Sequence, residues 1–283
     1  MRALFTVYIA MIAWGACAQK KEAPFTSPAN YSFNRPERIE LPAELKEVSG
    51  ITFLNGDPNT LFAQQDEQGH LYYLRPGDQS VQYIKFAGKG DYEDLAISNE
   101  HFILLRSDGS FFSFPLEQPY GANSSSVISE KVLPKGEYES LATSTANNRL
   151  YVLCKQCNID KKATHTTGYV IKLEINGKLT KTESFTIDNK QINDHAKLKG
   201  KAFRPSALAK NERTNEWYIL SSINKLLVIA DNNWKVKEAH ILDPKLFNQP
   251  EGMAFDKDNN LYISNEAGDT EKATLLKFVY KNQ

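Results

Sequence analysis

A short motif recurs along this chain and limits its fold more than any other feature: a Ser or Glu, any residue, a large aliphatic residue and a small residue. Successive copies are separated by 44, 46, 67 and 45 residues, and they begin at Ser49, Glu93, Glu139, Ser206 and Glu251. Three of the four intervals match the roughly 40–45 residues of a four-stranded propeller blade. The repeat therefore predicts an all-β fold, a β-propeller of five four-stranded blades.

The residues after each motif complete the unit. A second apolar strand that ends in a polar residue is expected at 61–66, 102–106, 151–155, 218–222 and 262–266. A third strand and a more polar fourth strand follow, separated by turn residues such as Asp108-Gly109 and Asn176-Gly177. Each unit alone exposes two apolar faces, so the units must pack face to face around a ring.

The long interval of 67 residues leaves six blades as the alternative. No motif copy lies inside it, and its last part is polar and rich in lysine, so we read an insertion near 188–203, as a short helix or loop. The last unit has no fourth strand, whereas 38–41 is a strand without a unit. Pairing the two would close the ring and remove its free edges, which predicts one propeller domain over 31–283.

Charge and length exclude some classes of protein. The chain of 283 residues is long enough for one packed domain and does not require a second. Lys+Arg and Asp+Glu are both 34, so the basic excess of a nucleic-acid-binding protein is absent. We expect a monomer whose partner is a small molecule or another envelope protein, with no nucleic acid.

The first residues have the features of an export signal. Arg2 precedes an apolar run over 4–14 that is too short to span a bilayer comfortably. Cleavage after Ala18 would give a soluble periplasmic or secreted protein. Residues 14–17 (WGAC) instead resemble a lipobox, in which Cys17 is lipidated. Because Cys is scarce elsewhere, we expect a signal peptide over 1–17 of the lipoprotein type. A polar tether over 18–30 would follow, and the lipid of an outer-membrane or surface protein would be its only membrane contact.

Cys154 and Cys157 form a C-x-x-C pair. Zinc needs further ligands, and neither a second Cys pair nor paired His residues occur in the sequence. A thioredoxin-like redox role needs a strand followed by a helix, whereas this pair ends a strand in a β-rich region. In an oxidising envelope the pair is expected to form a short-range disulfide.

The strand that begins each blade lines the central channel of a propeller, so the first residues of the motif copies should form a polar ring near one mouth. Glu47 should point the same way by strand alternation. The ends of the second strands, together with Arg204, extend the candidate binding set, which is Glu47, Ser49, Asp66, Glu93, Arg106, Glu139, Lys155, Arg204, Ser206, Ser222, Glu251, Asn265 and Glu266.

Converging carboxylates repel one another unless a positive charge compensates them. Calcium would do so, since it takes six to eight oxygen ligands, and Glu93, Glu139 and Glu251 are its candidate ligands. Arg106, Arg204 and Lys155 would do so instead in a closed network of ion pairs. A third interpretation is structural, because a repeated polar residue that caps backbone groups also produces a ring of like side chains.

At these residues the chain resembles the SdiA-regulated (YjiK-like) family of bacterial envelope proteins. The matching stretches are 47–51 (EVSGI), 92–96 (YEDLA), 138–142 (YESLA), 204–209 (RPSALA) and 249–254 (QPEGMA), with 150–155 and 261–266. The resemblance covers nearly all of residues 45–280. It implies a propeller in the cell envelope, with calcium at the channel as an option, and it brings no established reaction.

Two classes of function remain. The first is a propeller that binds a small ligand, ion or partner at its channel mouth. The second is a calcium-dependent hydrolase similar to propeller lactonases, phosphotriesterases or phytase-like esterases, in which the ion would polarise an ester or phosphoryl oxygen beside a carboxylate base. Such hydrolases usually place a dedicated His or Asp base beside the metal. No His falls in the predicted ring, and no catalytic residue is assigned, so binding is the expected function.

Overall fold

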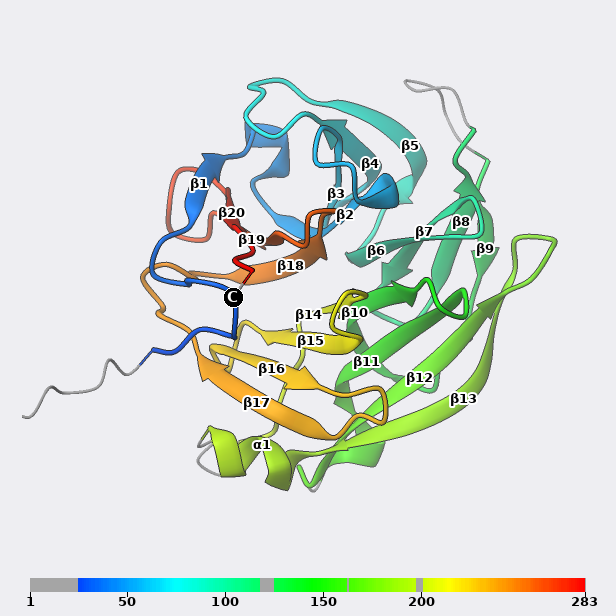
Figure 1. Ribbon diagram of the computed structural model, residues 1–283. Helices are drawn as coiled ribbons and strands as arrows, with labels where there is room; N and C mark the ends of the chain where they lie inside the picture. The colour runs from blue at the N-terminus through cyan, green and yellow to red at the C-terminus, as the bar shows by residue number, and fades with distance from the viewer. Residues whose placement is uncertain (1–24, 118–124, 162, 197–200, 283) are drawn as a thin grey trace, which may run out of the picture.

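The computed structural model describes residues 25–117, 125–161, 163–196 and 201–282, and these form five four-stranded antiparallel sheets. The sheets stand around a common axis as the blades of a propeller, with β2, β6, β10, β14 and β18 innermost (Figure 1). Each innermost strand contacts the innermost strands of the two neighbouring blades, so the ring is closed. The five-bladed propeller predicted from the repeat is confirmed, and six blades is excluded.

The blades follow the chain. Blade 1 contains β2 (Val48–Phe53), β3 (Leu61–Gln65), β4 (Gln68–Leu74) and β5 (Gln82–Lys89). Blade 2 contains β6 (Tyr92–Ser98), β7 (His101–Arg106), β8 (Phe111–Pro115) and β9 (Val127–Ser129). Blade 3 contains β10 (Gly136–Ser144), β11 (Arg149–Cys157), β12 (His165–Leu173) and β13 (Leu179–Asp188). Blade 4 contains β14 (Ala207–Asn211), β15 (Glu216–Ser221), β16 (Leu226–Ala230) and β17 (Val236–Ile241). Blade 5 contains β18 (Pro250–Phe255), β19 (Leu261–Asn265), β20 (Thr274–Phe278) and β1 (Glu37–Glu40).

The N-terminal strand closes the ring as predicted, because β1 is the outermost strand of blade 5 and pairs with β20. The residues before it strengthen this closure. Tyr31 and Phe33 are buried in the apolar cluster between blades 4 and 5, and the Tyr31 hydroxyl donates a hydrogen bond of 2.7 Å to the carbonyl oxygen of Asn259. The two ends of the described chain are therefore held together by packing as well as by strand pairing.

The core consists of five apolar clusters, one at each seam between consecutive blades. Alternate residues of a strand face opposite sides of its blade. In β3, Ala63 packs toward blade 5 whereas Phe62 packs against Phe102 of blade 2, with ring centroids 4.9 Å apart. Both faces of each blade are therefore buried, which explains why the strands read as nearly continuous apolar runs.

Little helix interrupts the strands. The polar segment after blade 3 contains α1 (Asn189–His195), whose first turn is capped by Asp188 accepting from the Lys190 amide at 2.9 Å. The 3-10 turns are η1 (Ala43–Leu45), η2 (Leu54–Gly56) and η3 (Asn158–Asp160). Within the described part of the chain, every helix is too short or too polar to cross a bilayer.

Candidate functional site

The first residue of the motif lies in a break of strand pairing in most blades. In β6 the register passes from Tyr92 to Asp94 without a partner for Glu93, and in β18 it passes from Pro250 to Gly252 without one for Glu251. Glu139 is skipped in the same way in β10. A β-bulge re-aims the extra side chain out of the ladder. These glutamates are therefore set apart from the alternating residues that fill the blade seams.

The starts of the innermost strands and the ends of the second strands lie at the same end of the channel, because the two strands are antiparallel. We call this end the acidic mouth and define it by its carboxyl groups: Glu47, Asp66, Asp91, Glu93, Glu139, Glu251 and Glu266. These groups interact electrostatically, since the charges of Glu251 and Asp66 both raise the pKa of Glu93 and the pKa of Glu266. These acids come from blades 1, 2, 3 and 5 and the residues just before them.

Two of these carboxyls hold their protons at neutral pH. Burial raises the pKa of Glu93 to about 9, and the nearby charges of Asp91, Glu251 and Asp66 act in the same direction, opposed by Lys155. Burial likewise raises the pKa of Glu266 to about 8, helped by Glu251, Glu47 and Asp66. The Gln249 amide donates a hydrogen bond of 2.7 Å to Glu266 and only partly opposes this. Burial is the largest cause of both shifts, and the neighbouring acids of the mouth add to it.

Glu251 and Asp66 follow the same trend. Burial raises the pKa of Glu251, against hydrogen bonds from Ser222 and Ser206 and the charges of Lys155 and Lys225. Burial and the charges of Glu47, Glu67 and Asp91 raise the pKa of Asp66. One oxygen of Asp66, Oδ1, is buried and has no hydrogen-bond partner among the described residues. A hydrogen-bond donor or a cation would satisfy this unpartnered buried oxygen, which lies near several other carboxyl groups.

Lys155 supplies positive charge to this mouth. Its ammonium forms ion pairs with Glu139 and, at 3.3 Å, with Glu137. Lys225 lies nearby and donates to the carbonyl oxygen of Asn248, while burial lowers its pKa against the charge of Glu251. Of the three predicted counter-charges, Lys155 is the one that forms ion pairs with the acids of the mouth among the described residues.

Other predicted residues are placed differently. The Arg106 guanidinium donates two hydrogen bonds, of 3.0 and 2.7 Å, to Asp108 in the β7–β8 turn. The Asn265 amide donates to the Leu246 carbonyl oxygen and to Thr274, on the outer side of its strand. Ser49 is 4% exposed, and its carbonyl oxygen accepts from Ser264. Arg204 contributes its backbone to a turn, through its amide to Asn224 and its carbonyl oxygen to Ser221.

Sequence reasoning missed Asp91, Lys225, Gln249 and Glu137, which all act on the mouth. Each lies one or two residues before a motif copy or in the turn after a second strand. Both places are at the same end of the channel as the starts of the innermost strands. Extending the candidate set by these positions in every blade would have found them.

Below the acidic mouth the innermost strands approach one another closely, at a level that we call the waist: Gly50, Asp94, Ser140, Ala207 and Gly252. A Cβ atom at Gly50 would collide with Asp94, and one at Gly252 would collide with the Ser49 carbonyl oxygen. Asp94 is 3% exposed and accepts from the amides of Leu95 at 2.8 Å and Leu141 at 2.6 Å. Burial raises its pKa well above the ordinary range. Asp94 therefore ties blade 2 to blade 3.

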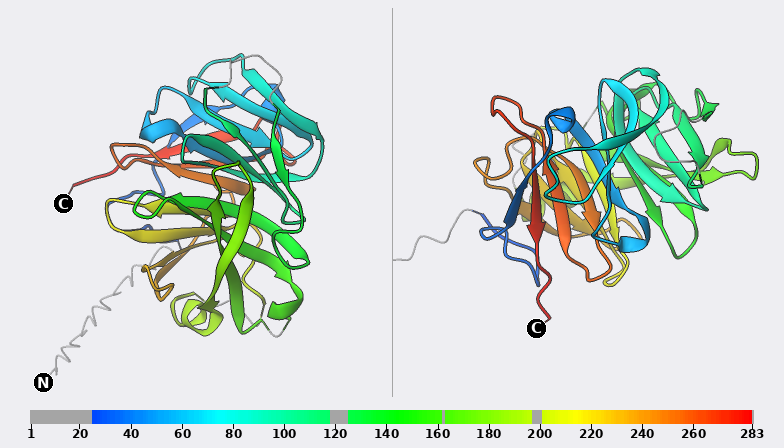
Figure 2. Two further views of the ribbon diagram at one scale, coloured as in Figure 1. Left: turned by 90° about the vertical axis from the view of Figure 1, so that its right-hand side faces the viewer. Right: turned by 90° about the horizontal axis from the view of Figure 1, so that it is seen from above.

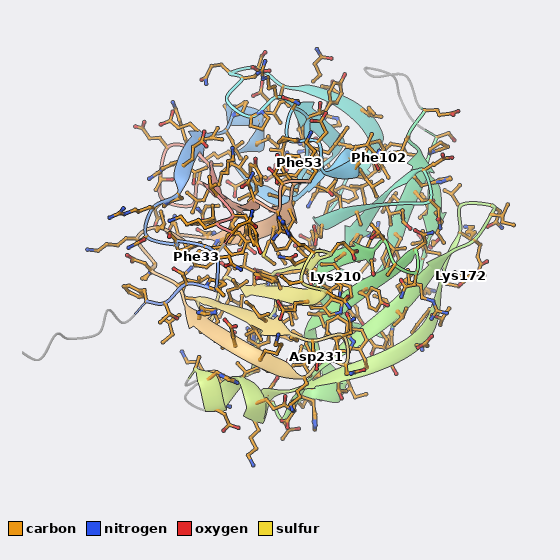
Figure 3. The ribbon with its side chains drawn as sticks, viewed as in Figure 1. Phe33, Phe53, Phe102, Lys172, Lys210 and Asp231 are labelled. Atoms are coloured by element: carbon orange, nitrogen blue, oxygen red, sulfur yellow. A yellow bond between two sulfur atoms is a disulfide. The ribbon has the colours of Figure 1, made fainter. Side chains whose placement is uncertain are left out.

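A cavity of about 1060 Å³ lies on the other side of the waist, at what we call the cavity mouth. Its lining comes from the second halves of the innermost strands and the loops after them, including Thr52, Thr143, Arg213, Asp258 and Asn282. Phe53 and Lys210, labelled in Figure 3, belong to this lining. Asn282 places the C-terminus at this mouth, which is the face toward the viewer in Figure 1, and Figure 2 shows the C-terminus leaving that face. The acids of the acidic mouth do not contribute to this lining.

The predicted calcium ligands do not form a metal site as they stand. Glu139 is paired with Lys155, whose positive charge also acts on Glu93 and Glu251. Among the residues that the structure describes, no three His, Cys, Asp or Glu side chains lie close enough together to hold a metal ion. This arrangement fits calcium poorly, because calcium takes six to eight oxygen ligands.

Comparison with known proteins supports the fold assignment. The model of the family described as SdiA-regulated matches residues 29–268. A search of curated protein sequences found no match.

Solved structures share the architecture at low identity. A glutaminyl cyclase from Myxococcus xanthus is 13% identical with a TM-score of 0.56, over 87% of this chain and 96% of that chain. A gluconolactonase from Xanthomonas campestris is 10% identical with a TM-score of 0.54, over 90% and 94% of the two chains. A luciferin-regenerating enzyme is also 10% identical with a TM-score of 0.54, over 87% and 95%. At such identities these likenesses indicate the fold alone.

Proposed function

The chain belongs to the SdiA-regulated family, and from the acidic mouth of its propeller we propose that it is a binding protein that takes the positively charged group of a ligand there. An organic ammonium, on a small molecule or on a basic side chain of an envelope protein, is the ligand chemistry that fits. One observation carries this proposal: burial and neighbouring acids raise the pKa values of several carboxyl groups at the acidic mouth, although the charges of Lys155 and Lys225 act there.

A carboxyl group beside an opposite charge has a lowered pKa, whereas Glu93 and Glu266 have values of about 9 and 8. A cation that enters the mouth would replace those protons, because it stabilises the ionised carboxylates. Binding should therefore release protons and strengthen as the pH rises toward 9. For each proton released, the affinity changes by about tenfold per pH unit below the pKa of the group.

The test is a titration of the protein with butylamine at pH 6, 7 and 8, with 1-butanol as the uncharged control. We expect butylamine to raise the melting temperature through mass action, increasingly so at higher pH. The double variant Glu93→Gln, Glu251→Gln should lose the effect. Glu212→Gln, at the cavity mouth, should keep it.

The proposal fails if butanol and butylamine act equally, or if butylamine binding is independent of pH. A parallel titration with calcium chloride separates the two cation sources. A melting-temperature increase with calcium that Glu93→Gln, Glu251→Gln removes, without any response to butylamine, would replace the ammonium proposal with a metal site.

The alternative is a calcium-dependent hydrolase of the lactonase, phosphotriesterase or phytase-like type. The similarity to a gluconolactonase is at 10% identity and brings no residue roles. The ion pair between Lys155 and Glu139 weighs against it, since it occupies one of the three candidate ligands. Turnover of lactones or phosphoesters that depends on calcium and on Glu93 would establish the alternative.

We also propose that the propeller works at the cell envelope, anchored through Cys17. The segment 1–24, which contains Cys17, lies outside the described residues, so this proposal rests on the sequence. A Cys17→Ala variant should move from the membrane fraction to the soluble fraction. An unchanged distribution would rule out lipidation as the anchor.

A further inference from the structure

Lys155 is a cation of the protein's own chain that already lies in the acidic mouth. It forms ion pairs with Glu139 and Glu137 of the neighbouring strand in its own blade. Its charge also favours ionisation of Glu93 in blade 2 and of Glu251 in blade 5. The side chain is 19% exposed, so it lies largely within the mouth and not in solvent.

The local backbone explains how Lys155 reaches this position. In the β10–β11 pair, Cys154 faces Tyr138 and Gln156 faces Glu137, so Lys155 has no partner in the register. Lys155 is thus an extra residue in its strand, and the Tyr138–Cys154 pair separates it from the skipped Glu139 of β10. Bulges of this kind re-aim a side chain. The two bulges turn Lys155 and Glu139 toward each other.

A disulfide encloses this extra residue. Cys154 and Cys157, on either side of Lys155 and Gln156, are bonded to each other. Cys157 pairs with Gly136 in the β10–β11 register. A Cβ atom at position 136 would collide with the Cys157 sulfur, so this close approach requires glycine. The disulfide therefore restrains the end of β11 that carries Lys155. Without the disulfide, this part of the strand would have more conformations available.

The result is an uneven mouth. On the blade 3 side, Lys155 compensates Glu139 and Glu137. On the side of blades 1, 2 and 5, Asp66, Glu93 and Glu266 keep raised pKa values. Among the described residues, the carboxyls of the mouth that have no ion pair and keep raised pKa values lie on the second side. A second ammonium of the same ligand would have to approach Lys155, which repels it.

We infer that Lys155, held by the Cys154–Cys157 bulge, is the specificity-determining residue of the acidic mouth and restricts it to ligands with one positive charge. This inference rests on the proposed function. It specifies that the ligand carries a single positive charge. It also assigns to the disulfide the role of positioning Lys155. The disulfide itself does not touch the ligand in this account.

The experiment compares butylamine with 1,4-diaminobutane, which has the same carbon chain and a second ammonium, by calorimetric titration at pH 8. Wild-type protein should bind butylamine more tightly than the diamine, and equal or tighter binding of the diamine would overturn the inference. Lys155→Gln should shift the ratio of affinities toward the diamine by about tenfold or more, because it frees Glu139 and Glu137 and removes the repulsion. Lys155→Arg should keep the wild-type preference.

The disulfide is tested separately with the double variant Cys154→Ala, Cys157→Ala. It should shift the ratio in the same direction as Lys155→Gln but less, because Lys155 remains and is only less well positioned. Circular dichroism and the melting temperature show whether each variant is folded. If Lys155→Gln does not fold, Lys155→Arg, which keeps the positive charge, shows whether wild-type selectivity is retained.

The outcomes separate the two claims. A ratio that stays within twofold of wild type in folded Lys155→Gln, while butylamine still binds, overturns the role of Lys155 and leaves the proposed function intact. A disulfide variant with an unchanged ratio overturns the positioning role alone. Wild-type protein that binds neither amine overturns the proposed function and this inference with it.

Discussion

The two mouths of the channel are built from the same five innermost strands, yet they differ in what they offer. The acidic mouth concentrates carboxyl groups with raised pKa values. The cavity mouth offers a volume of about 1060 Å³ with both signs of charge on its rim, as at Arg213 and Asp258. A ligand site is usually sought where a concavity and perturbed pKa values coincide. Here they are separated by the waist.

We base the proposed function on the acidic mouth, because space alone gives no preference for one chemistry. The neighbours Glu93 and Asp94 show the contrast most clearly. Both carboxyls have raised pKa values from burial, but Asp94 accepts hydrogen bonds from the adjacent Leu95 amide and, across a blade seam, from the Leu141 amide, whereas Glu93 lies in a bulge. A raised pKa alone therefore does not distinguish a candidate binding group from a structural one. The hydrogen-bond partners of the carboxyl group make the distinction.

The largest expected effect is at the waist between the mouths. Asp94→Ala leaves the buried amides of Leu95 and Leu141 without acceptors and should lower the free energy of unfolding by about 2–4 kcal/mol. Asp94→Asn keeps one acceptor oxygen and should lose less. Urea denaturation measures both. Equal stability of Asp94→Ala and wild type would show that Asp94 is not the tie between blades.

The second effect is the pH dependence of stability. Because the folded-state pKa values of Glu93 and Glu266 lie above their ordinary value of 4.5, the folded protein binds more protons than the unfolded chain at intermediate pH. Their contribution to stability is full below about pH 4.5 and is lost as the pH rises through 8 and 9. The variant Glu93→Gln, Glu266→Gln should flatten this fall.

At pH 9 that double variant should melt above wild type by about 2–4 °C, which thermal denaturation across pH 5–9 would detect. A matched pair at the cavity mouth, Glu212→Gln and Asp258→Asn, should leave the slope unchanged. Parallel curves for wild type and Glu93→Gln, Glu266→Gln would mean that these acids ionise normally, and the contrast between the mouths would lose its basis.

A smaller effect is expected in the wall of the cavity. The Thr143 hydroxyl is buried without a hydrogen-bond partner among the described residues. Thr143→Val removes the unpaired hydroxyl at nearly constant shape, so the free energy of unfolding should stay equal or rise by up to about 1 kcal/mol. A clear loss of stability in urea would indicate that the hydroxyl has a partner in solution, such as water or a ligand in the cavity.

The smallest effect is on the rim of that cavity. Glu212 is exposed and accepts from the Thr145 amide at 2.7 Å. Glu212→Gln keeps an acceptor oxygen, so stability should change by less than about 0.5 kcal/mol. Its butylamine affinity should match wild type, since exposed charges beyond a Debye length of about 8 Å are screened. A change above twofold would mean that the mouths are coupled.

Much of this architecture could be predicted because a propeller repeats one unit. The recurrence of the motif gave the number of blades, and the unpaired segment before Glu47 gave the closing strand. The carboxyls of Glu93, Glu251 and Glu266 were placed at one mouth for the same reason. Arg106, predicted as a counter-charge for the ring, forms its ion pair with Asp108, two residues away in its own turn.

The sequence by itself determined the ring, since apolar alternation and turn residues act locally and a repeated unit must bury both faces against copies of itself. Only the tertiary structure decided which acids are candidate binding groups, because that depends on bulges in the pairing, on hydrogen bonds across seams and on the dielectric surroundings of each carboxyl. The bulges depend on pairing within a blade, and the hydrogen bond between Asp94 and Leu141 joins residues 47 positions apart in two blades. Glu93 and Asp94 are adjacent in the chain, yet Glu93 lies in a bulge whereas Asp94 accepts a hydrogen bond from the next blade.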